Sequence, residues 1–322
     1  CVMPGDGIGR EVIPAAVTVL QAVIPDLQIV EAEAGWDCFQ RRGASVPQAT
    51  LDAIRSCGAG LFGAVSSPSR RVEGYRSAII TMRQALDLYA NIRPVRSWPG
   101  VAPRSDVDMI IVRENTEGLY SGREYWRGET AVAERLITPQ ASQRIAEKAL
   151  ALCAALGRQK LTIVHKANVL PLTDGLFRDT VREAVAQYEL PLAVDELLVD
   201  VAALKMVAEP QRFDVLVTTN LFGDILSDAA AHWGGGLGLA PSLNWGDGVA
   251  VAEPVHGSAP DIAGQGIANP IAAILSGALL ARHVWGLVEA ADRVETAVAR
   301  VLAQSSLPVG TTAVTQAILN HL

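Results

Sequence analysis

The chain has 322 residues, of which 50% are hydrophobic and 19% charged, and its formal net charge at pH 7 is -7. This length allows two domains or one large α/β unit with an ample apolar core. The acidic balance argues against nucleic acid and against an anionic membrane surface as main partners, because both select basic patches.

The cysteines indicate the redox compartment. Cys1, Cys38, Cys57 and Cys153 show neither paired metal-ligand spacing nor a disulfide pattern, so we expect a reducing, cytoplasmic environment. No apolar run approaches the ~18 residues that span a bilayer, and the first residues lack the order of a signal peptide.

A glycine-rich turn follows the first predicted strand. Residues 1–23 predict a strand, the turn at 5–9 and an amphipathic helix. The turn lacks the dinucleotide-binding spacing, so we expect a tight strand-to-helix turn close to a ligand. Residues 27–35, 47–57 and 58–65 predict strand, helix and strand, and this alternation implies an α/β fold with a doubly wound parallel sheet.

Positive charge is concentrated in the next segment. Arg83 lies in a predicted helix and Arg93 follows a predicted strand at 86–92. Arginine binds carboxylates bidentately, so the segment is a candidate anion site. Surface ion pairs are the alternative, above all for Arg96 and Arg104. The cluster consists of Arg70, Arg71, Arg76, Arg83, Arg93 and Arg96.

The middle of the chain predicts a second α/β region after a proline-rich crossover at 94–104. A strand at 108–112 ends in a polar cluster at 113–120, the position where open α/β sheets bind ligands. We expect a β-hairpin at 120–137 and helices at 139–156 and 174–188.

Two charged residues stand out in this region. A strand at 161–165 runs into Lys166, which is either a solvated strand end or a buried base with a shifted pKa. Asp200 falls within a predicted strand at 193–207, where an unpaired carboxylate would be costly.

Residues 215–228 form the centre of the predicted site. A strand at 215–217 ends in a turn, and a helix is expected from about Gly223 to about Ala231. Asp224 and Asp228 then lie on one helix face, an arrangement that suits Mg²⁺. The alternative is a solvated acidic face near a helix N-terminus. A glycine-rich turn at 234–242, a buried helix starting near Pro270 and one amphipathic C-terminal helix follow.

Six motifs together resemble the β-decarboxylating dehydrogenases, namely isocitrate, isopropylmalate, homoisocitrate and tartrate dehydrogenases. They are PGDGIGREV, LDLYANIRP, VRENTEGLY, HKANVLP, TTNLFGDILSD and EPVHGSAPDIAGQGIANP. Two further segments, AGWDCFQRRGASVP and LFGAVSSPSRRVEGY, look most like homoisocitrate dehydrogenases. The resemblance implies an isocitrate/isopropylmalate dehydrogenase-like fold of two doubly wound domains. Residues 1–94 with 236–322 would bind the nucleotide, and 95–235 would hold metal, substrate and a dimer arm at about 120–137.

The resemblance also assigns roles to residues. Arg83, Arg93 and Arg113 match the arginines that bind the malate carboxylates, while Tyr120 matches the acid that protonates the enolate carbon. Lys166, from a partner subunit, matches the base that accepts the hydroxyl proton. The implied ligands of Mg²⁺ or Mn²⁺ are Asp224 and Asp228, together with Asp200 of the partner. K⁺ is a further candidate cofactor. Ser67, Arg76 and Asn168 complete the expected substrate contacts.

The expected cofactor is NAD. Asp261 stands where the family's nucleotide loop accepts hydrogen bonds from the adenosine ribose, and it would repel a 2′-phosphate. The other expected cofactor contacts are Ile8, Gly9, His256, Gly257, Ser258, Ala259 and Asn269.

The expected reaction is the oxidative decarboxylation of homoisocitrate to 2-oxoadipate in lysine biosynthesis, by a homodimer or higher homo-oligomer. Isocitrate, isopropylmalate and tartrate are alternative substrates. Ile80 stands where homoisocitrate dehydrogenases often have an arginine for the distal carboxylate, so Arg76, or Arg70 and Arg71, would have to substitute. The alternative of another class is a noncatalytic regulatory paralogue.

Overall fold

The computed structural model describes residues 1–70, 72–306 and 308–322. Arg71, one of the candidates for the distal carboxylate, lies outside them. The chain divides into two compact units: unit 1 contains residues 1–88, 97–105 and 234–322, and unit 2 contains residues 89–96 and 106–233. None of the described helices is both long and apolar enough to cross a membrane.

Unit 1 is built on four strands in the order β1-β2-β11-β10. β1 and β11 run parallel to β2, while β10 is antiparallel to β11. The strands are β1 (Val2–Gly5), β2 (Ala59–Ala64), β10 (Pro241–Trp245) and β11 (Ala250–Pro254). The helices are α1 (Gly9–Val23), α2 (Trp36–Arg42), α3 (Gln48–Cys57), α4 (Ala78–Ala85), α9 (Ile271–His283), α10 (Val288–Leu302) and α11 (Thr311–Leu319).

Both faces of the unit 1 sheet are covered. Phe62 of β2 faces a core that also contains Leu51 of α3 and Met82 of α4. The next residue, Gly63, faces α1 so closely that a Cβ there would lie 2.8 Å from Ile13. Because successive strand residues point to opposite faces, α1 and the α3–α4 pair lie on opposite sides of the sheet.

Unit 2 contains the strands in the order β3-β4-β9-β7-β8, in which β4, β9, β7 and β8 are parallel and β3 is antiparallel to β4. They are β3 (Ala90–Arg96), β4 (Asp108–Glu114), β7 (Lys160–His165), β8 (Ala193–Leu198) and β9 (Val215–Thr218). The helices are α5 (Pro139–Leu156), α6 (Thr173–Gln187), α7 (Val199–Ala208) and α8 (Asn220–Ala231).

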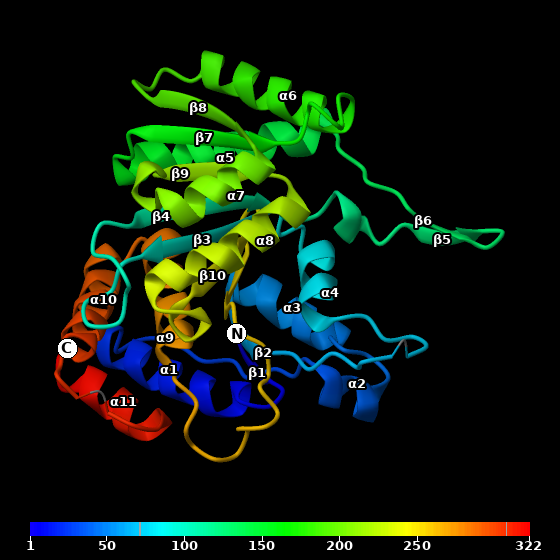
Figure 1. The fold of residues 1–322 in the computed structure, drawn as a ribbon. Helices are drawn as coiled ribbons and strands as arrows, with labels where there is room; N and C mark the ends of the chain where they lie inside the picture. Colours follow the sequence, from blue (N-terminus) through cyan, green and yellow to red (C-terminus); the bar gives the residue numbers. More distant parts are fainter. Residues whose placement is uncertain (71, 307) are drawn as a thin grey trace. The chain divides into compact units, whose positions relative to one another are not determined.

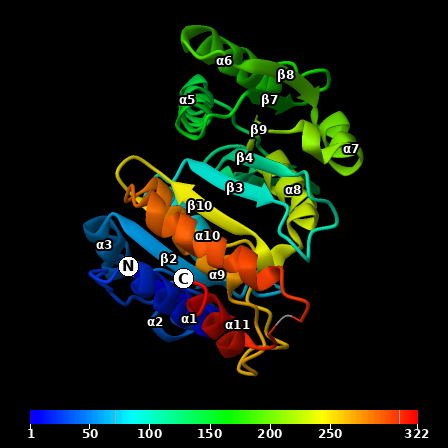
Figure 2. The same cartoon turned by 90° about the vertical axis from the view of Figure 1, so that its left-hand side faces the viewer.

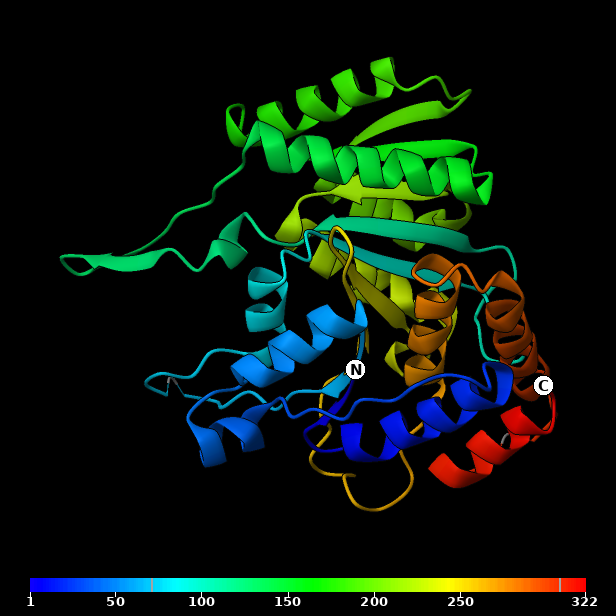
Figure 3. The same ribbon diagram turned by 180° about the vertical axis from the view of Figure 1, so that it is seen from behind.

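These helices form a layer on each face of the unit 2 strands. α7 and α8 lie in front of the strands in Figure 1, and α5 lies in front of them in the reverse view of Figure 3. Figure 2 shows α5 and α7 on opposite sides of β7 and β9. The α7–α8 side buries Met206 and Leu226 against Leu216 of β9. The predicted doubly wound α/β arrangement is therefore confirmed.

A two-stranded hairpin projects from unit 2 (Figure 1). Its strands β5 (Glu124–Arg127) and β6 (Thr130–Ala133) pair antiparallel across a turn at 128–129. The hairpin predicted at 120–137 is confirmed, and Trp126 at its tip is 72% exposed.

Several predicted elements need correction. Residues 27–35 form only an isolated bridge between Val2 and Glu31, in which Val2 donates to the Val30 carbonyl at 2.7 Å and Ala32 donates to the Val2 carbonyl at 2.9 Å. Residues 193–207 divide into β8 and α7, so Asp200 lies on a helix whose buried residues Ala202 and Met206 are four apart. The predicted single C-terminal helix is two helices, α10 and α11.

Candidate active site

Arg93 connects the two predicted metal ligands in unit 2. It lies within β3 rather than after it, and its side chain is 9% exposed. Its Nη1 donates to Asp228 Oδ1 at 2.9 Å, and its Nη2 donates to Asp224 Oδ1 at 3.3 Å. Nε donates to Asn91 Oδ1 at 2.8 Å, and Nη1 also donates to Ser227 Oγ at 2.7 Å. The two carboxylates are thus adjacent, as their spacing on α8 predicted.

Arg113 binds the same carboxylate from β4. Its Nη1 donates to Asp224 Oδ1 at 2.5 Å, and its Nε donates to the carbonyl oxygen of Asn220 at 2.8 Å. A Cβ on Gly223 would lie 2.5 Å from Arg113 Cγ, so the stem of Arg113 fits only because α8 has glycine there. This packing fixes the guanidinium against the first turn of α8.

Tyr120 completes the cluster. Its hydroxyl donates to Asp224 Oδ2 at 2.5 Å, and the Arg113 guanidinium lies 4.9 Å from its ring centre. Burial raises the pKa of Tyr120, and its bond to Asp224 adds to the effect. Burial also raises the pKa of Asp228, partly opposed by Arg93 and reinforced by the charge of Asp224.

Lys166 and Asp200 form a second group in unit 2. Lys166 Nζ donates to Asp200 Oδ1 at 2.5 Å, and this bond lowers the pKa of Asp200, which is exposed. Asn168 is exposed two residues beyond Lys166. Among the described residues, no group of three or more His, Cys, Asp or Glu side chains is placed to hold a metal. One chain therefore does not bring Asp200 to the α8 carboxylates.

Three loops of unit 1 meet at the carboxyl ends of β1, β2 and β11. The N–H of Ile8 donates to the Ser258 carbonyl at 2.9 Å, and Ser66 Oγ donates to Ser258 Oγ at 2.8 Å. Asp6, which is 2% exposed, accepts from the backbone of Ser66 and Trp36. Ile8 and Gly9 are buried in this junction, whereas Gly257 is exposed. Ligands of open α/β sheets bind at such an edge.

The loop after β11 carries the remaining predicted cofactor contacts. Burial lowers the pKa of His256, and its Nε2 is buried without a hydrogen-bond partner among the described residues. Ala259 has φ +39°, an uncommon value that turns the chain. Asp261 is exposed, and Asn269 Oδ1 accepts from the N–H of Ile271 at the start of α9.

The arginines of unit 1 differ in environment. Arg83 is 6% exposed and binds Asn244 at 2.9 Å and Glu253 at 3.0 Å. Its expected contact with substrate stays a prediction. Arg76 and Ser67 are exposed, and Ile80 is partly buried.

Sequence reasoning missed the residues that hold the charged groups in place. Asn91, Ser227 and Asn220 fix the two arginines, and Asp6 joins the loops of unit 1. Their contacts come from other elements of the fold, so no local spacing signalled them. Only Asp6, an acidic residue within a glycine-rich turn, carried a local hint.

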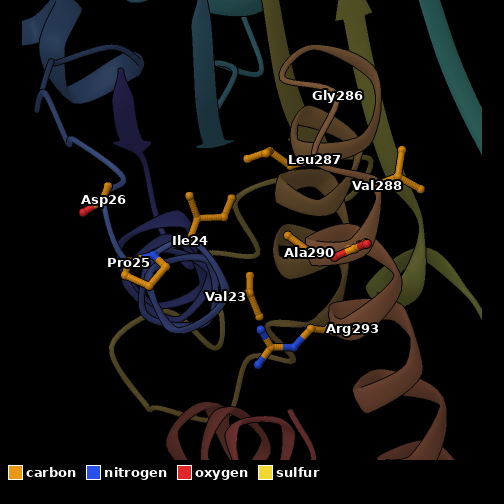
Figure 4. Close-up of a pocket in the computed structure, with 10 residues that line it drawn as sticks. Val23, Ile24, Pro25, Asp26, Gly286, Leu287, Val288, Ala290 and Arg293 are labelled. Atoms are coloured by element: carbon orange, nitrogen blue, oxygen red, sulfur yellow. The ribbon is translucent and has the colours of Figure 1, made fainter.

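A hollow elsewhere in unit 1 lacks these features. It has a volume of about 600 Å³ and lies between the end of α1 and the loop before α10 (Figure 4). Val23, Ile24 and Leu287 line it together with Asp26 and Arg293. None of the predicted site residues lines this hollow.

The chain is similar to known proteins over nearly its whole length. A sequence model of the isocitrate/isopropylmalate dehydrogenase family matches residues 1–317. An isocitrate/homoisocitrate dehydrogenase of Thermus thermophilus is 56% identical over 302 residues, 94% of this chain and 90% of that protein. A 3-isopropylmalate dehydrogenase of Methanothermobacter thermautotrophicus is 48% identical over 94% of this chain and 90% of its own length. A crystal structure of isocitrate dehydrogenase from Methylococcus capsulatus has a TM-score of 0.94 and 43% identity, and covers 99% of this chain and 98% of that one.

Proposed function

Because the chain belongs to the isocitrate/isopropylmalate dehydrogenase family, we propose that it catalyses the NAD- and metal-dependent oxidative decarboxylation of a 2-hydroxy-3-carboxy acid. Homoisocitrate is the first candidate substrate and 2-oxoadipate its product. The family and its named relatives are dehydrogenases, which supports an oxidoreductase.

The arginine–aspartate cluster of unit 2 carries this proposal. Arg93 and Arg113 are buried guanidinium groups that share the carboxylates of one helix face. A substrate with several carboxylates would take over these donors, since guanidinium binds carboxylate bidentately. Tyr120, bonded to Asp224, would then stand beside the reacting part of the substrate and give it a proton.

The same cluster suits a divalent cation. Asp224 and Asp228 offer hard oxygen donors one helix turn apart, and their side chains are 32% and 54% exposed. Mg²⁺ is commonly held by one or two carboxylates with water and substrate oxygens. When bound, Mg²⁺ or Mn²⁺ would lower the pKa of the substrate hydroxyl and stabilise the negative charge left by loss of CO₂. Asp200 of a partner subunit would be the third ligand.

Lys166 is the proposed base for the hydroxyl proton, and it acts in the site of the partner subunit. Its contact with Asp200 supports this role, because the two side chains would enter the partner's site together. A homodimer is also supported by large apolar side chains that are exposed on the hairpin, α7 and α8. They are Tyr125, Trp126, Leu204, Val207 and Ile225.

NAD fits the three-loop junction of unit 1. The buried Nε2 of His256 has no partner among the described residues and can bind a nucleotide. The Asp261 carboxylate can accept hydrogen bonds from ribose hydroxyls, and it repels a 2′-phosphate. NAD would accept the hydride, while Ile8 and Gly9 would lie on the nicotinamide side. The proposed division of labour assigns the nucleotide to 1–94 with 236–322 and metal and substrate to 95–235, except that Arg93 belongs with the arginine–aspartate cluster of unit 2.

Fewer residues bear on the choice of substrate than on the reaction or the cofactor. The relative from Thermus thermophilus is named for isocitrate and homoisocitrate, whereas another relative is named for 3-isopropylmalate. Ile80 cannot receive a distal carboxylate, so exposed Arg76 is the proposed substitute, and Arg70, which is also exposed, is the alternative. Ser67 and Asn168 are proposed as further substrate contacts.

Steady-state kinetics test the proposal. We would compare kcat/KM for homoisocitrate, isocitrate, isopropylmalate and tartrate, each with NAD and NADP, in Mg²⁺ with K⁺ present. The highest value is expected for homoisocitrate with NAD, and chelation of the metal should abolish turnover. A preference for isopropylmalate would keep the reaction and overturn the role of Arg76. No turnover of any of the four acids would favour the noncatalytic regulatory paralogue.

A further inference from the structure

A buried ion pair lies behind the turn that carries Lys166. Asp174, in the first turn of α6, is fully buried and pairs with Nη1 of Arg135, whose side chain is 15% exposed. The other carboxylate oxygen, Oδ2 of Asp174, accepts from the backbone N–H of Lys166 at 2.6 Å. One carboxylate therefore joins Arg135 to the proposed base.

The turn itself is held at two successive amides. His165 Nδ1 accepts from the N–H of Ala167 at 3.0 Å, and its Nε2 lies 3.0 Å from Glu196 Oε1. The N–H of Lys166 is held by Asp174 as described above. Two side-chain acceptors thus fix the backbone on both sides of the Lys166 Cα.

Arg135 is anchored by more than its ion pair. Nη1 donates to Thr173 Oγ1 at 2.9 Å, and Nη2 donates to Thr219 Oγ1 at 3.1 Å, at the start of α8. The guanidinium lies 5.3 Å from the ring centre of Phe222. A single planar group therefore joins the first turns of α6 and α8, a geometry that lysine could not reproduce.

Arg135 also belongs to the root of the hairpin. It follows β6 and lies between Glu134, whose N–H donates to the Arg123 carbonyl at 2.9 Å, and Leu136, which pairs with Gly118. Because the residues on both sides of Arg135 are paired in this way, its Cα is fixed at the root of the hairpin. The ion pair therefore connects the hairpin to the Lys166 turn.

We propose that the Arg135–Asp174 ion pair is a positioning device that holds the Lys166 turn in register with the hairpin root and with α8. This inference rests on the proposed function of Lys166 as the base. Neither residue is assigned a contact with substrate, metal or cofactor. Misplacing a reacting group by about 1 Å can cost ~100-fold in rate, so positioning the base is a sufficient role.

The test uses two variants of the pair and a matched control. Arg135→Gln leaves Asp174 buried without its cation, and Asp174→Asn removes the charge but keeps a carbonyl oxygen, so one variant remains informative if the other fails to fold. The control is Arg158→Gln. Arg158 binds Asp214 at 3.0 Å, and Asp214 accepts from the N–H groups of Gln159 and Lys160, so the same architecture occurs at the opposite end of β7.

Two readouts are measured for each protein: steady-state kcat and KM, and hydrogen exchange of the Lys166 amide. Both pair variants should speed that exchange ~10-fold or more, because without the ion pair the side chain at position 174 is no longer held against the Lys166 amide. They should lower kcat ~10- to 100-fold while KM stays within ~3-fold. The control Arg158→Gln should change neither kcat nor the exchange rate of the Lys166 amide by more than ~2-fold.

The proposal is overturned if the pair variants keep the wild-type kcat and amide protection, or if Arg158→Gln lowers kcat equally. If the wild-type protein oxidises none of the acids, the proposed function fails instead. Amide exchange then decides the positioning role alone: faster exchange in the pair variants supports it, and unchanged exchange contradicts it.

Discussion

Tyr120 and Asp224 are joined by a hydrogen bond of 2.5 Å from the phenol to Oδ2, while Arg113 binds Oδ1 of the same carboxylate. The bond places an O–H donor and a proposed metal ligand in direct contact. Because burial raises the pKa of the Tyr120 hydroxyl, the phenol keeps its proton at neutral pH.

The Tyr120→Phe variant should therefore lose the proton donor but keep the carboxylate site. We expect kcat to fall ~100-fold or more, the usual contribution of a positioned acid, with KM changed less than ~5-fold. Steady-state assays of NADH and CO₂ release measure it. Tyr125→Phe on the exposed hairpin is the control, and equal losses in both variants would contradict the role of Tyr120.

Gly223→Ala tests the contact between α8 and Arg113. The new methyl group would lie 2.5 Å from Arg113 Cγ, so the arginine or the helix must move. We expect a loss of about 1–3 kcal/mol in unfolding free energy and a higher KM for the acid. Gly175→Ala in α6 meets no atom within 4 Å and should be neutral or stabilising. Similar unfolding curves for both variants would show that Arg113 is not held as described.

Asp261→Ala tests cofactor choice. Removing the carboxylate eliminates both the ribose acceptor and the repulsion of a 2′-phosphate. The ratio of kcat/KM with NAD to that with NADP should fall ~10-fold or more, a change equivalent to about one charge-assisted hydrogen bond. An unchanged ratio would mean that Asp261 does not contact the ribose.

His283 should make the folded chain less stable at acidic pH. Burial, with a smaller contribution from Arg282, lowers its pKa from 6.5 to about 4. The unfolded chain therefore binds a proton that the folded chain rejects between these values, so stability is complete above pH 6.5 and falls as the pH drops toward 4. His283→Gln should flatten this fall, as measured by denaturant unfolding at pH 7 and 4.5. A fall as steep as in the wild type would exclude His283 as its source.

The sequence predicted most elements of the fold because their signals are local. The helix at 139–156 has a Thr138 N-cap and Pro139 at its start, and the structure reproduces it. The strand prediction at 193–207 failed because the scattered valines of this apolar segment suited a strand, whereas burial of Ala202 and Met206 favours a helix from Val199 onward.

The site residues show the same difference between local signals and contacts that depend on the fold. Motifs identified Arg93, Arg113, Tyr120 and Asp224 as candidates, and the structure brings these four together. The ion pair of Arg135 with Asp174 was not predicted, because the two residues are 39 positions apart and neither lies in a pattern that implies the other. Contacts of this kind depend on how strands are ordered, which single-sequence periodicity does not specify.

The central claim is that each active site combines the α8 carboxylates of one chain with Lys166 and Asp200 of another. Subunit mixing tests it most directly. Lys166→Met and Asp224→Asn should each be inactive, but a refolded equal mixture should recover about a quarter of wild-type activity, since half of the dimers are mixed and each has one intact site. Lys166→Met mixed with Asp200→Asn should recover none, because both changes then fall on the same contributing side. No recovery in the first mixture, or recovery in the second, would contradict the shared site.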